Sequence, residues 1–422
     1  MRHHFRCANQ QKELQIRKKI RIVYFSVIVV MVFSATMVFC FSRRAFAHEL
    51  YQVHRDAREE GMGGAYISVV NDAESLWFNP AGIARDTGTY WTIATIRAGA
   101  SDPSELQDLQ NLQSQSSFNS TLQKLYGKPM WADVGEKSPY ADADSAFIMP
   151  GLAFSYFMDG DSSILIDNPV DPTLDLNYIE DKGFALGTGF SFGNVLQFGV
   201  AGKYIMRTGV RQAFGADTIA NILNGGSTST IFNSLNNTGT GISLDAGANL
   251  ILPGQMHPVL SFVWKNIGNT DFKPDTGSAA APPSDPAELE AGGALRFDLP
   301  GMTILPAFEV DYMNDSTVQL GQKLHAGVEL SLPLIALRAG LDQGYFSYGC
   351  GFNLGIIRID AASWGEEMGG AQGQMESQRY LVEVSLRMGF SGAHSGSADD
   401  SSDSGNWESY FDTGGDGRFV RR

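Results

Sequence analysis

Histidine and cysteine, the side chains that most often do chemistry near neutral pH, are few and scattered in this sequence. The chain has seven histidines and three cysteines, Cys7, Cys40 and Cys350. No G-x-S-x-G, H-E-x-x-H or phosphate-loop motif occurs, and no spacing suits a metal site. Cys350 is the one cysteine beyond the first 47 residues, so a disulfide framework is excluded. The sequence therefore predicts no enzyme, no cofactor and no metal ion.

A segment rich in small residues is the next candidate for function. It contains two groups, which are Gly61, Gly63 and Gly64, and Asn79, Pro80, Ala81 and Gly82. Glycine permits a positive φ and the close approach of another backbone. A residue that precedes proline is disfavoured in a helix. Asp72 is placed to cap a brief helix over 73–77. These residues predict tight turns, which either seat the segment against another element or contact a ligand.

Residues 1–47 have the organisation of a secretory signal peptide. Seven Lys and Arg lie within the first 21 residues, an apolar run follows over 22–41, and Ala45, Phe46 and Ala47 form an A-x-A cleavage site. The run is long enough to cross a bilayer, so an uncleaved anchor is the alternative. The A-x-A site, and the lack of a second apolar span, favour cleavage between Ala47 and His48.

Composition and charge narrow the class of the remaining chain. Glycine is abundant at 47 residues, and charged residues make up 18%, below the roughly 25% of soluble domains. Residues 1–47 hold nine of the 31 Lys and Arg and one of the 46 Asp and Glu, which leaves 22 basic and 45 acidic residues and a net charge of −23. A chain this acidic has no basic stripe for a nucleic acid.

The hydrophobic pattern after residue 89 repeats every two residues, which is the period of a β-strand. In 323–331, for example, apolar residues alternate with Lys323, His325 and Glu329. About 14 strands are predicted, at 90–98, 146–157, 163–168, 176–192, 195–207, 242–252, 258–267, 289–298, 303–312, 323–331, 334–341, 345–354, 356–364 and 379–390.

The lengths of the links between these strands separate two fold classes. Short links at 159–161, 193–194, 253–254, 300–301 and 332–333 alternate with long ones at 99–145, 208–241, 268–288, 313–322 and 365–378. A soluble β-sandwich would also alternate apolar and polar faces but has no reason to keep this parity. Barrels of the Gram-negative outer membrane have short periplasmic turns and long outer loops. We therefore predict an all-β, antiparallel, up-and-down transmembrane barrel.

Four regions follow from these patterns: a signal peptide over 1–47, an N-terminal segment over 48–89, a barrel over 90–390 and a disordered acidic tail over 391–422. The last strand ends at Phe390, as the assembly signal of such barrels does. Charged residues on the polar faces of the strands predict a polar lumen in which opposite charges pair. They are Lys203, Arg207, Asp245, Arg296, Glu309, Asp311, His325, Glu329, Arg338, Arg358, Glu383 and Arg387.

The segment 61–84 resembles the plug, or hatch, of the FadL family of outer-membrane transporters for long-chain fatty acids. The resemblance is carried by G-M-G-G-A-Y at 61–66 and by N-P-A-G at 79–82. The related PorV- and PorQ-like barrels, some of which serve protein secretion, share this signature, and 337–340 and 345–353 look more like them. The resemblance implies a hatched barrel in which 48–89 is the N-terminal hatch, or plug, and Asn79, Pro80 and Ala81 belong to the hatch motif.

One outer loop is a candidate ligand groove. The stretch 104–126 has apolar residues at helical spacing, which are Leu106, Leu109, Leu112, Phe118 and Leu122. In the FadL family, loop helices form an apolar groove for the incoming ligand. The alternative is that such residues pack on one another and cap the barrel.

Two functions remain open at this point. The first is passive transport of hydrophobic, fatty-acid-like molecules, which predicts an apolar pocket at the hatch and a lateral gap between strands. The second is a secretion or envelope-assembly barrel that docks protein partners, with the 391–422 tail as a candidate periplasmic contact. Both require the lipid of the outer membrane as surroundings.

Overall fold

The computed structural model describes residue 50 and residues 52–85, 88–101, 127–133, 142–167, 173–193, 195–218, 235–254, 256–369 and 372–390. Three predictions therefore fall outside the described residues. They are the signal peptide with its cleavage site at Ala47–His48, the loop groove formed by Leu106, Leu109, Leu112, Phe118 and Leu122, and the acidic tail over 391–422.

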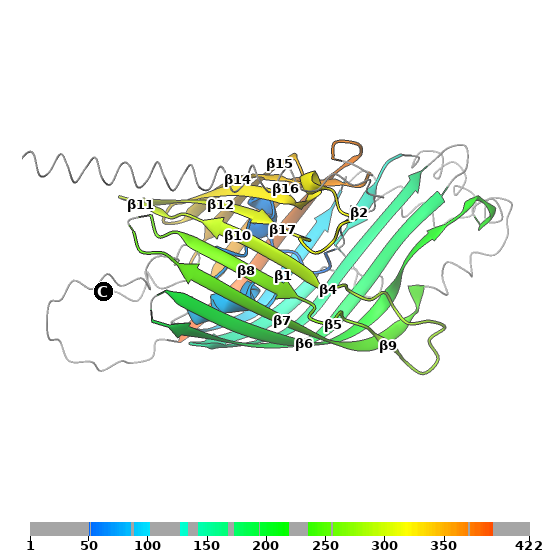
Figure 1. The fold of residues 1–422 in the computed structure, drawn as a ribbon, viewed down its shortest axis with the longest axis horizontal. Coiled ribbons are helices and arrows are strands. Elements are labelled where there is room, and N and C mark those ends of the chain that lie inside the picture. Colours follow the sequence, from blue (N-terminus) through cyan, green and yellow to red (C-terminus); the bar gives the residue numbers. More distant parts are fainter. Residues whose placement is uncertain are drawn as a thin grey trace, which may run out of the picture. The chain divides into compact units, whose positions relative to one another are not determined.

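Within the described residues, fourteen antiparallel strands pair in sequence order and close into a barrel (Figure 1). The ring closes where the last strand pairs with the first, with Thr89 opposite Phe390. The strands are β1 (Thr89–Ala100), β3 (Asp142–Met149), β4 (Leu152–Asp167), β5 (Thr173–Phe192), β6 (Leu196–Phe214), β7 (Thr238–Ile251), β8 (Val259–Lys265), β10 (Glu288–Ala294), β12 (Met302–Val310), β13 (Leu324–Ser331), β14 (Ile335–Asp342), β15 (Tyr345–Asn353), β16 (Ile357–Glu367) and β17 (Glu376–Phe390).

Three short strands extend the edges of the wall: β2 (Met130–Ala132), β9 (Lys273–Pro274) and β11 (Phe297–Leu299). β2 pairs with β4 and β9 with β7, while β11 continues the line of β10 along β12. A single 3-10 turn, η3 (Leu320–Lys323), precedes β13. No helix among the described residues is long and apolar enough to cross a membrane.

The predicted fold class and number of strands are confirmed, but two predicted boundaries are wrong. The predicted strand 146–157 is interrupted by a tight turn at 150–151, where Gly151 has a φ of 75°. The predicted turn at Asp159 and Asp161 lies inside β4, which also absorbs 163–168. Both aspartates point into the lumen and are hydrogen-bonded there, so acidic side chains that resembled a turn are inward-facing wall positions.

The links keep most of the predicted parity. One end of the barrel has short links at 150–151, 193–195, 300–301, 332–334 and 354–356, with a longer one at 252–258; β1 begins and β17 ends there. At the other end the links 101–141, 215–237, 266–287, 311–323 and 368–375 are longer. The links 168–172 and 343–344 at that end are short, so the parity is not strict.

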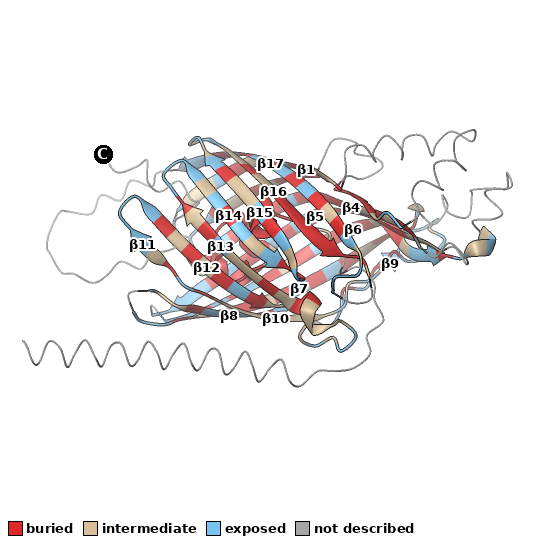
Figure 2. Ribbon diagram, turned by 90° about the horizontal axis from the view of Figure 1, so that it is seen from above, coloured by how far each residue is buried: buried red, intermediate tan, exposed pale blue. Residues whose placement is uncertain are grey.

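The wall reverses the arrangement of a soluble protein, because its apolar side chains point outward and its polar ones inward. On β14, Arg338 is buried while its neighbours Leu337 and Ala339 are exposed. Figure 2 shows this alternation of buried and exposed residues along the strands. An outward apolar surface suits lipid, and the inward charges pair as predicted, for example Lys203 with Asp245 at 2.6 Å.

The lumen is filled by the N-terminal segment, which we call the hatch (residues 50–88). It contains α2 (Ala57–Gly61) and two 3-10 turns, η1 (Ala73–Leu76) and η2 (Pro80–Arg85), drawn in blue inside the barrel in Figure 1. Hatch residues such as Tyr66 and Phe78 pack against Val263 and Leu305 of the wall. The hatch therefore forms the apolar core that the wall alone lacks.

Candidate functional site

The first contact of the hatch with the wall lies at the end of α2. Asp56 caps this helix, because its carboxylate accepts hydrogen bonds from the N–H groups of Arg58 (2.7 Å) and Glu59 (3.0 Å). The chain then turns through Gly63 and Gly64, whose φ angles are 66° and 78°. These left-handed conformations favour glycine, which is the reason for the sequence at this turn.

Close backbone approach is the second requirement at this turn. A Cβ atom placed on Gly63 would lie 2.6 Å from the backbone nitrogen of Leu341 in β14, and one on Gly61 would lie 3.1 Å from the Cα of Gly349 in β15. A Cβ on Gly340 of β14 would lie 2.7 Å from the nitrogen of Gly63. The hatch and the wall therefore meet here through glycines on both sides.

The second contact is formed by Asn79, Pro80, Ala81 and Ala84, which sit on a row of wall glycines. Gly189 of β5, Gly199 of β6 and Gly247 of β7 are direct neighbours across the strands. A Cβ on Gly199 would lie 2.1 Å from the carbonyl carbon of Pro80, and one on Gly247 would lie 2.1 Å from Oδ1 of Asn79. We call Gly189, Gly199 and Gly247 the glycine row.

Asn79 is fully buried and holds the hatch together at this point. Its Nδ2 donates to the carbonyl of Ile67 (2.8 Å), and its Oδ1 accepts from the N–H of Ala81 (3.0 Å). Gly82 serves the same turn, because a Cβ on it would lie 2.7 Å from the carbonyl oxygen of Val70. The predicted motif residues thus lie at two contacts with the wall, and their visible role is to seat the hatch.

A chain of buried ion pairs also fixes the hatch to β13 of the wall and continues to β14 and β16. Arg58 of α2 contacts Glu329 of β13 at 2.8 Å, and Glu329 also contacts Arg338 of β14 at 2.8 Å. Arg338 continues to Asp360 of β16 at 2.7 Å. All four side chains are at most 2% exposed, so removing one partner would leave a buried charge without compensation.

A second network surrounds His54 of the hatch. Its Nε2 lies 2.7 Å from Glu74 and its Nδ1 lies 2.9 Å from Asp159 of β4, while its ring stacks on Trp77 at 4.1 Å. Burial alone would lower the pKa of His54, but the carboxylates of Asp159 and Glu74 outweigh burial and raise this pKa to about 9. His54 is therefore a buried imidazolium that links the hatch to the wall.

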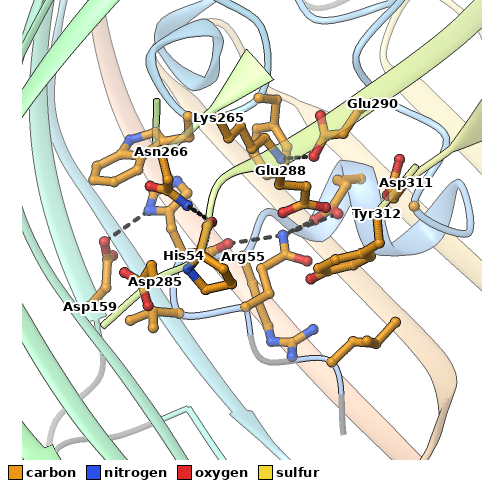
Figure 3. A pocket seen from close by; sticks show the side chains of 18 of the residues that line it. His54, Arg55, Asp159, Lys265, Asn266, Asp285, Glu288, Glu290, Asp311 and Tyr312 are labelled. Atoms are coloured by element: carbon orange, nitrogen blue, oxygen red, sulfur yellow. Dashed lines mark hydrogen bonds and ion pairs between the residues drawn. The ribbon is translucent and has the colours of Figure 1, made fainter. Parts of the chain in front are cut away.

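A cavity of about 230 Å³ opens between the hatch and wall strands from β4 to β16, with Trp77 and Phe78 of the hatch among its lining residues. Its lining includes twelve Asp and Glu against five Lys and Arg and two His, so it suits a cation better than a carboxylate. Figure 3 shows His54, Arg55 and Asp159 on one side of it and Glu288, Glu290 and Asp311 on the other.

The sequence did not predict the wall glycines that meet the hatch at its two contacts, or most of the residues that line the cavity. Gly189, Gly199 and Gly247 are ordinary glycines until the register of β5, β6 and β7 aligns them. Small residues at inward positions of neighbouring strands are the signal that points to such a row. The strands' inward acids were predicted as lumen charges only in part, since Asp159 was assigned to a turn.

No protein-family model and no curated protein sequence matches this chain. Solved structures similar to it include the CymD monoaromatic hydrocarbon channel, at 10% identity and a TM-score of 0.48 over 82% of this chain and 100% of that one. A Pseudomonas aeruginosa FadL homologue follows at 12% identity and a TM-score of 0.43, over 81% and 99%. The Pseudomonas putida toluene transporter TodX has 10% identity and a TM-score of 0.43, over 82% and 99%. At these scores the names decide nothing about the ligand of this chain.

Proposed function

We propose that this chain is a hatched barrel of the Gram-negative outer membrane that mediates the passive transport of hydrophobic, fatty-acid-like small molecules. The proposal rests on the FadL-like motif of the hatch, on the apolar outer surface of the closed barrel, and on one observation about where apolar surface lies inside it. Because the wall is one uninterrupted ring of paired strands and the hatch fills its lumen, a ligand has to pass between the hatch and the wall.

The observation that carries the proposal is an apolar interface between the hatch and strands β3 to β6. We call it the hatch interface. Leu76 and Ile83 of the hatch meet small and aromatic wall residues there, which are Ala146, Ile148, Ala153, Phe157, Ala185, Ala201 and Ile205. Tyr90 of β1 packs against the same cluster. On the side of β13, β14 and β16 the hatch and the wall are joined by buried ion pairs, so an apolar molecule would meet a smaller desolvation cost at the hatch interface than on that side.

Strand β1 is irregular beside this interface. Its register shifts between Thr92 and Ala94 against β17, and between Thr92 and Thr95 against β3. A β-bulge of this kind leaves one residue unpaired and bends the strand. Pairing is therefore locally weakened at β1, and we take this strand, which borders the hatch interface, as the candidate position of the predicted lateral gap.

The charged cavity does not fit the apolar pocket expected from the sequence. Asn79, Pro80 and Ala81 are packed on the glycine row and do not line it. A hydrophobic ligand would therefore follow the hatch interface, which is closed in this conformation, and would have to displace side chains to pass.

Filling the hatch interface tests the proposal. Cells that carry the full chain would be given a fluorescent long-chain fatty acid, and the rate of uptake compared with cells that lack the protein. Ala146→Trp fills the interface, whereas Ala339→Trp places the same ring on the exposed outer face. We expect uptake to require the protein, to fall toward the background in Ala146→Trp, and to be retained in Ala339→Trp. Heat-modifiable migration on SDS gels confirms that both variants fold.

Uptake that is the same with and without the wild-type protein would remove the transport proposal.

The second candidate function is that of a barrel that docks protein partners. It is favoured by how firmly the hatch is fixed, through Arg58 and Glu329 on one side and the glycine row on the other. It predicts a stoichiometric envelope partner that co-purifies with the wild-type barrel and is lost when residues 391–422 are removed. Fractionation of the cell envelope checks the outer-membrane location. N-terminal sequencing checks removal of the signal peptide, and the mature chain is expected to begin at His48.

A further inference from the structure

Three carboxylates face one another at the side of the cavity formed by β10 and β12. Glu288 and Glu290 are two residues apart on β10, so both point inward, and Asp311 directly follows β12, the strand paired with β10. One oxygen from each carboxylate lies within 4.8 Å of the other two. Figure 3 shows these side chains converging beside Tyr312.

The charges of this group are not balanced by the protein. Lys265 of β8 contacts Glu290 at 2.5 Å, which gives one ammonium group for three carboxylates. The side chain of Glu290 is fully buried, and its Oε2 has no hydrogen-bond partner among the described residues. The buried Oδ1 of Asp311 has none either. Buried carboxylates this close together require either a compensating cation or a shared proton.

His325 of β13 supplies an independent observation, because it approaches the same group from a different strand. Its Nδ1 lies 3.2 Å from the carbonyl oxygen of Gly63, which can only accept a hydrogen bond, so Nδ1 carries a proton. Asp342 lies 2.9 Å from the same nitrogen as an ion-pair partner. The Nε2 of His325 lies 3.4 Å from Oδ2 of Asp311 but makes no hydrogen bond, and the side chain is 7% exposed.

Oε2 of Glu290 and Nε2 of His325 are thus two buried polar atoms on different strands that face the same group of carboxylates without a hydrogen-bond partner among the described residues. A backbone carbonyl that holds the other ring nitrogen, as that of Gly63 does here, is a usual arrangement around a histidine beside a metal ion.

We propose that Glu288, Glu290 and Asp311 bind a divalent metal cation, with His325 beside Asp311 as a further ligand or support. Oxygen ligands at about 2.1 to 2.5 Å from one ion lie up to about 4 to 5 Å apart, which matches the spacing of these three carboxylates. The ion would join β10 and β12 next to His325, which in turn contacts the Gly63 turn of the hatch. This site does not depend on what the barrel transports, and the sequence did not predict it.

Binding of Mn²⁺ to the purified full-length protein in detergent tests the proposal. After treatment with EDTA and its removal, Mn²⁺ is added and the free ion is measured by electron paramagnetic resonance, with Ca²⁺ and Zn²⁺ as competitors. Glu290→Gln and Asp311→Asn each remove one ligand at almost constant size. Asp271→Asn removes an exposed carboxylate in the link after β8 and is the matched control.

We expect one Mn²⁺ bound per chain, displaced by Ca²⁺ or Zn²⁺. We expect affinity reduced roughly 10- to 100-fold in Glu290→Gln and Asp311→Asn, and unchanged affinity in Asp271→Asn. Heat-modifiable migration shows which variants are folded, and using two variants allows for one that does not fold. Wild-type protein that binds none of the three ions saturably would overturn the proposal in favour of a shared proton. Equal binding by the folded variants would overturn it as well.

Discussion

Gly199 of β6 lies so close to Pro80 of the hatch that a Cβ atom on Gly199 would be 2.1 Å from both the carbonyl carbon and the carbonyl oxygen of Pro80. No real side chain tolerates such a distance, and the atoms it would meet are backbone, which cannot rotate away. The wall and the hatch motif are therefore complementary at the level of single atoms. The small residues of both follow from one requirement, which is to bring two backbones together inside a barrel.

Replacing Gly199 by alanine is expected to displace the hatch. Overpacking of a buried contact costs about 1–3 kcal/mol or more, and here the whole η2 turn has to move. The temperature at which the folded form is lost on SDS gels should fall, and trypsin should cleave the hatch faster. Gly202→Ala, three residues along the same strand, is the control, because its Cβ would meet nothing closer than Leu244 at 3.5 Å. Equal stability of the two variants would contradict the role of the glycine row.

The barrel could be predicted from the sequence because its alternation is local. Each strand shows its two faces to lipid and lumen, so residues such as Leu337 and Arg338 report the wall without knowledge of any partner strand. The hatch was expected from a resemblance, and this was possible because the residues that carry it, such as Gly63 and Asn79, lie close together in sequence. Strand boundaries were predicted wrongly where an acidic residue that faces the lumen resembles a turn residue, as Asp159 does.

The candidate site could not be predicted to the same extent, because it depends on register. Gly189, Gly199 and Gly247 come from three strands, and their alignment appears only when the strands are paired. Glu290 and Asp311 are likewise 21 positions apart in sequence. Opposite charges pair in the lumen as predicted, but the alternation of residues along a strand does not reveal that Glu329 pairs with Arg58 of the hatch.

Asn79 should be the most sensitive polar residue of the hatch. Asn79→Ala leaves the carbonyl of Ile67 and the N–H of Ala81 without partners in a dry site, at about 1–3 kcal/mol for each. Asn79→Asp retains an acceptor for Ala81 but places a carboxylate against the Ile67 carbonyl, so it should be worse. Thermal loss of the folded form measures both. Asn353→Ala, which removes a similar bond to the N–H of Gly355 in a half-exposed turn, should cost much less.

The Arg58–Glu329 pair should be strongly coupled. Glu329→Gln leaves Arg58 and Arg338 facing a neutral group in a buried site, which typically costs about 3–5 kcal/mol. Combining it with Arg58→Met removes the stranded charge on the hatch side, so the double variant should be less destabilised than the sum of the two single ones. A double-mutant cycle from chemical denaturation measures this coupling. Additive effects would contradict it.

The matched comparison for this cycle is the pair of Arg296 and Asp298 near the 300–301 turn. These side chains contact at 2.9 Å, but that of Asp298 is 43% exposed. Water screens such a pair, so Asp298→Asn should change stability by about 1 kcal/mol or less. A similar loss in both pairs would indicate that burial is not the cause.

Alkaline pH should loosen the hatch through His54, which belongs to the hatch and not to a spanning strand. The pKa of His54 is raised from 6.5 to about 9. A raised pKa of a cationic group adds stability that is complete below pH 6.5 and is lost as the pH rises through 9. With about 1.4 kcal/mol for each pH unit, the loss should reach about 3 kcal/mol. Trypsin cleavage of the hatch between pH 6.5 and 9.5 should accelerate accordingly.

The variant His54→Gln tests the origin of that dependence. It keeps a hydrogen-bonding side chain beside Asp159 and Glu74 but removes the titrating group, so the protein should be less stable at pH 6.5 and its cleavage rate should change little with pH above 6.5. His257→Gln, in the 252–258 link far from these carboxylates along the chain, should retain the profile of the wild type. A steep profile that persists in His54→Gln would assign the pH dependence to other buried groups of the hatch, of which Glu60, with a pKa raised to about 8 by burial, is the first to examine.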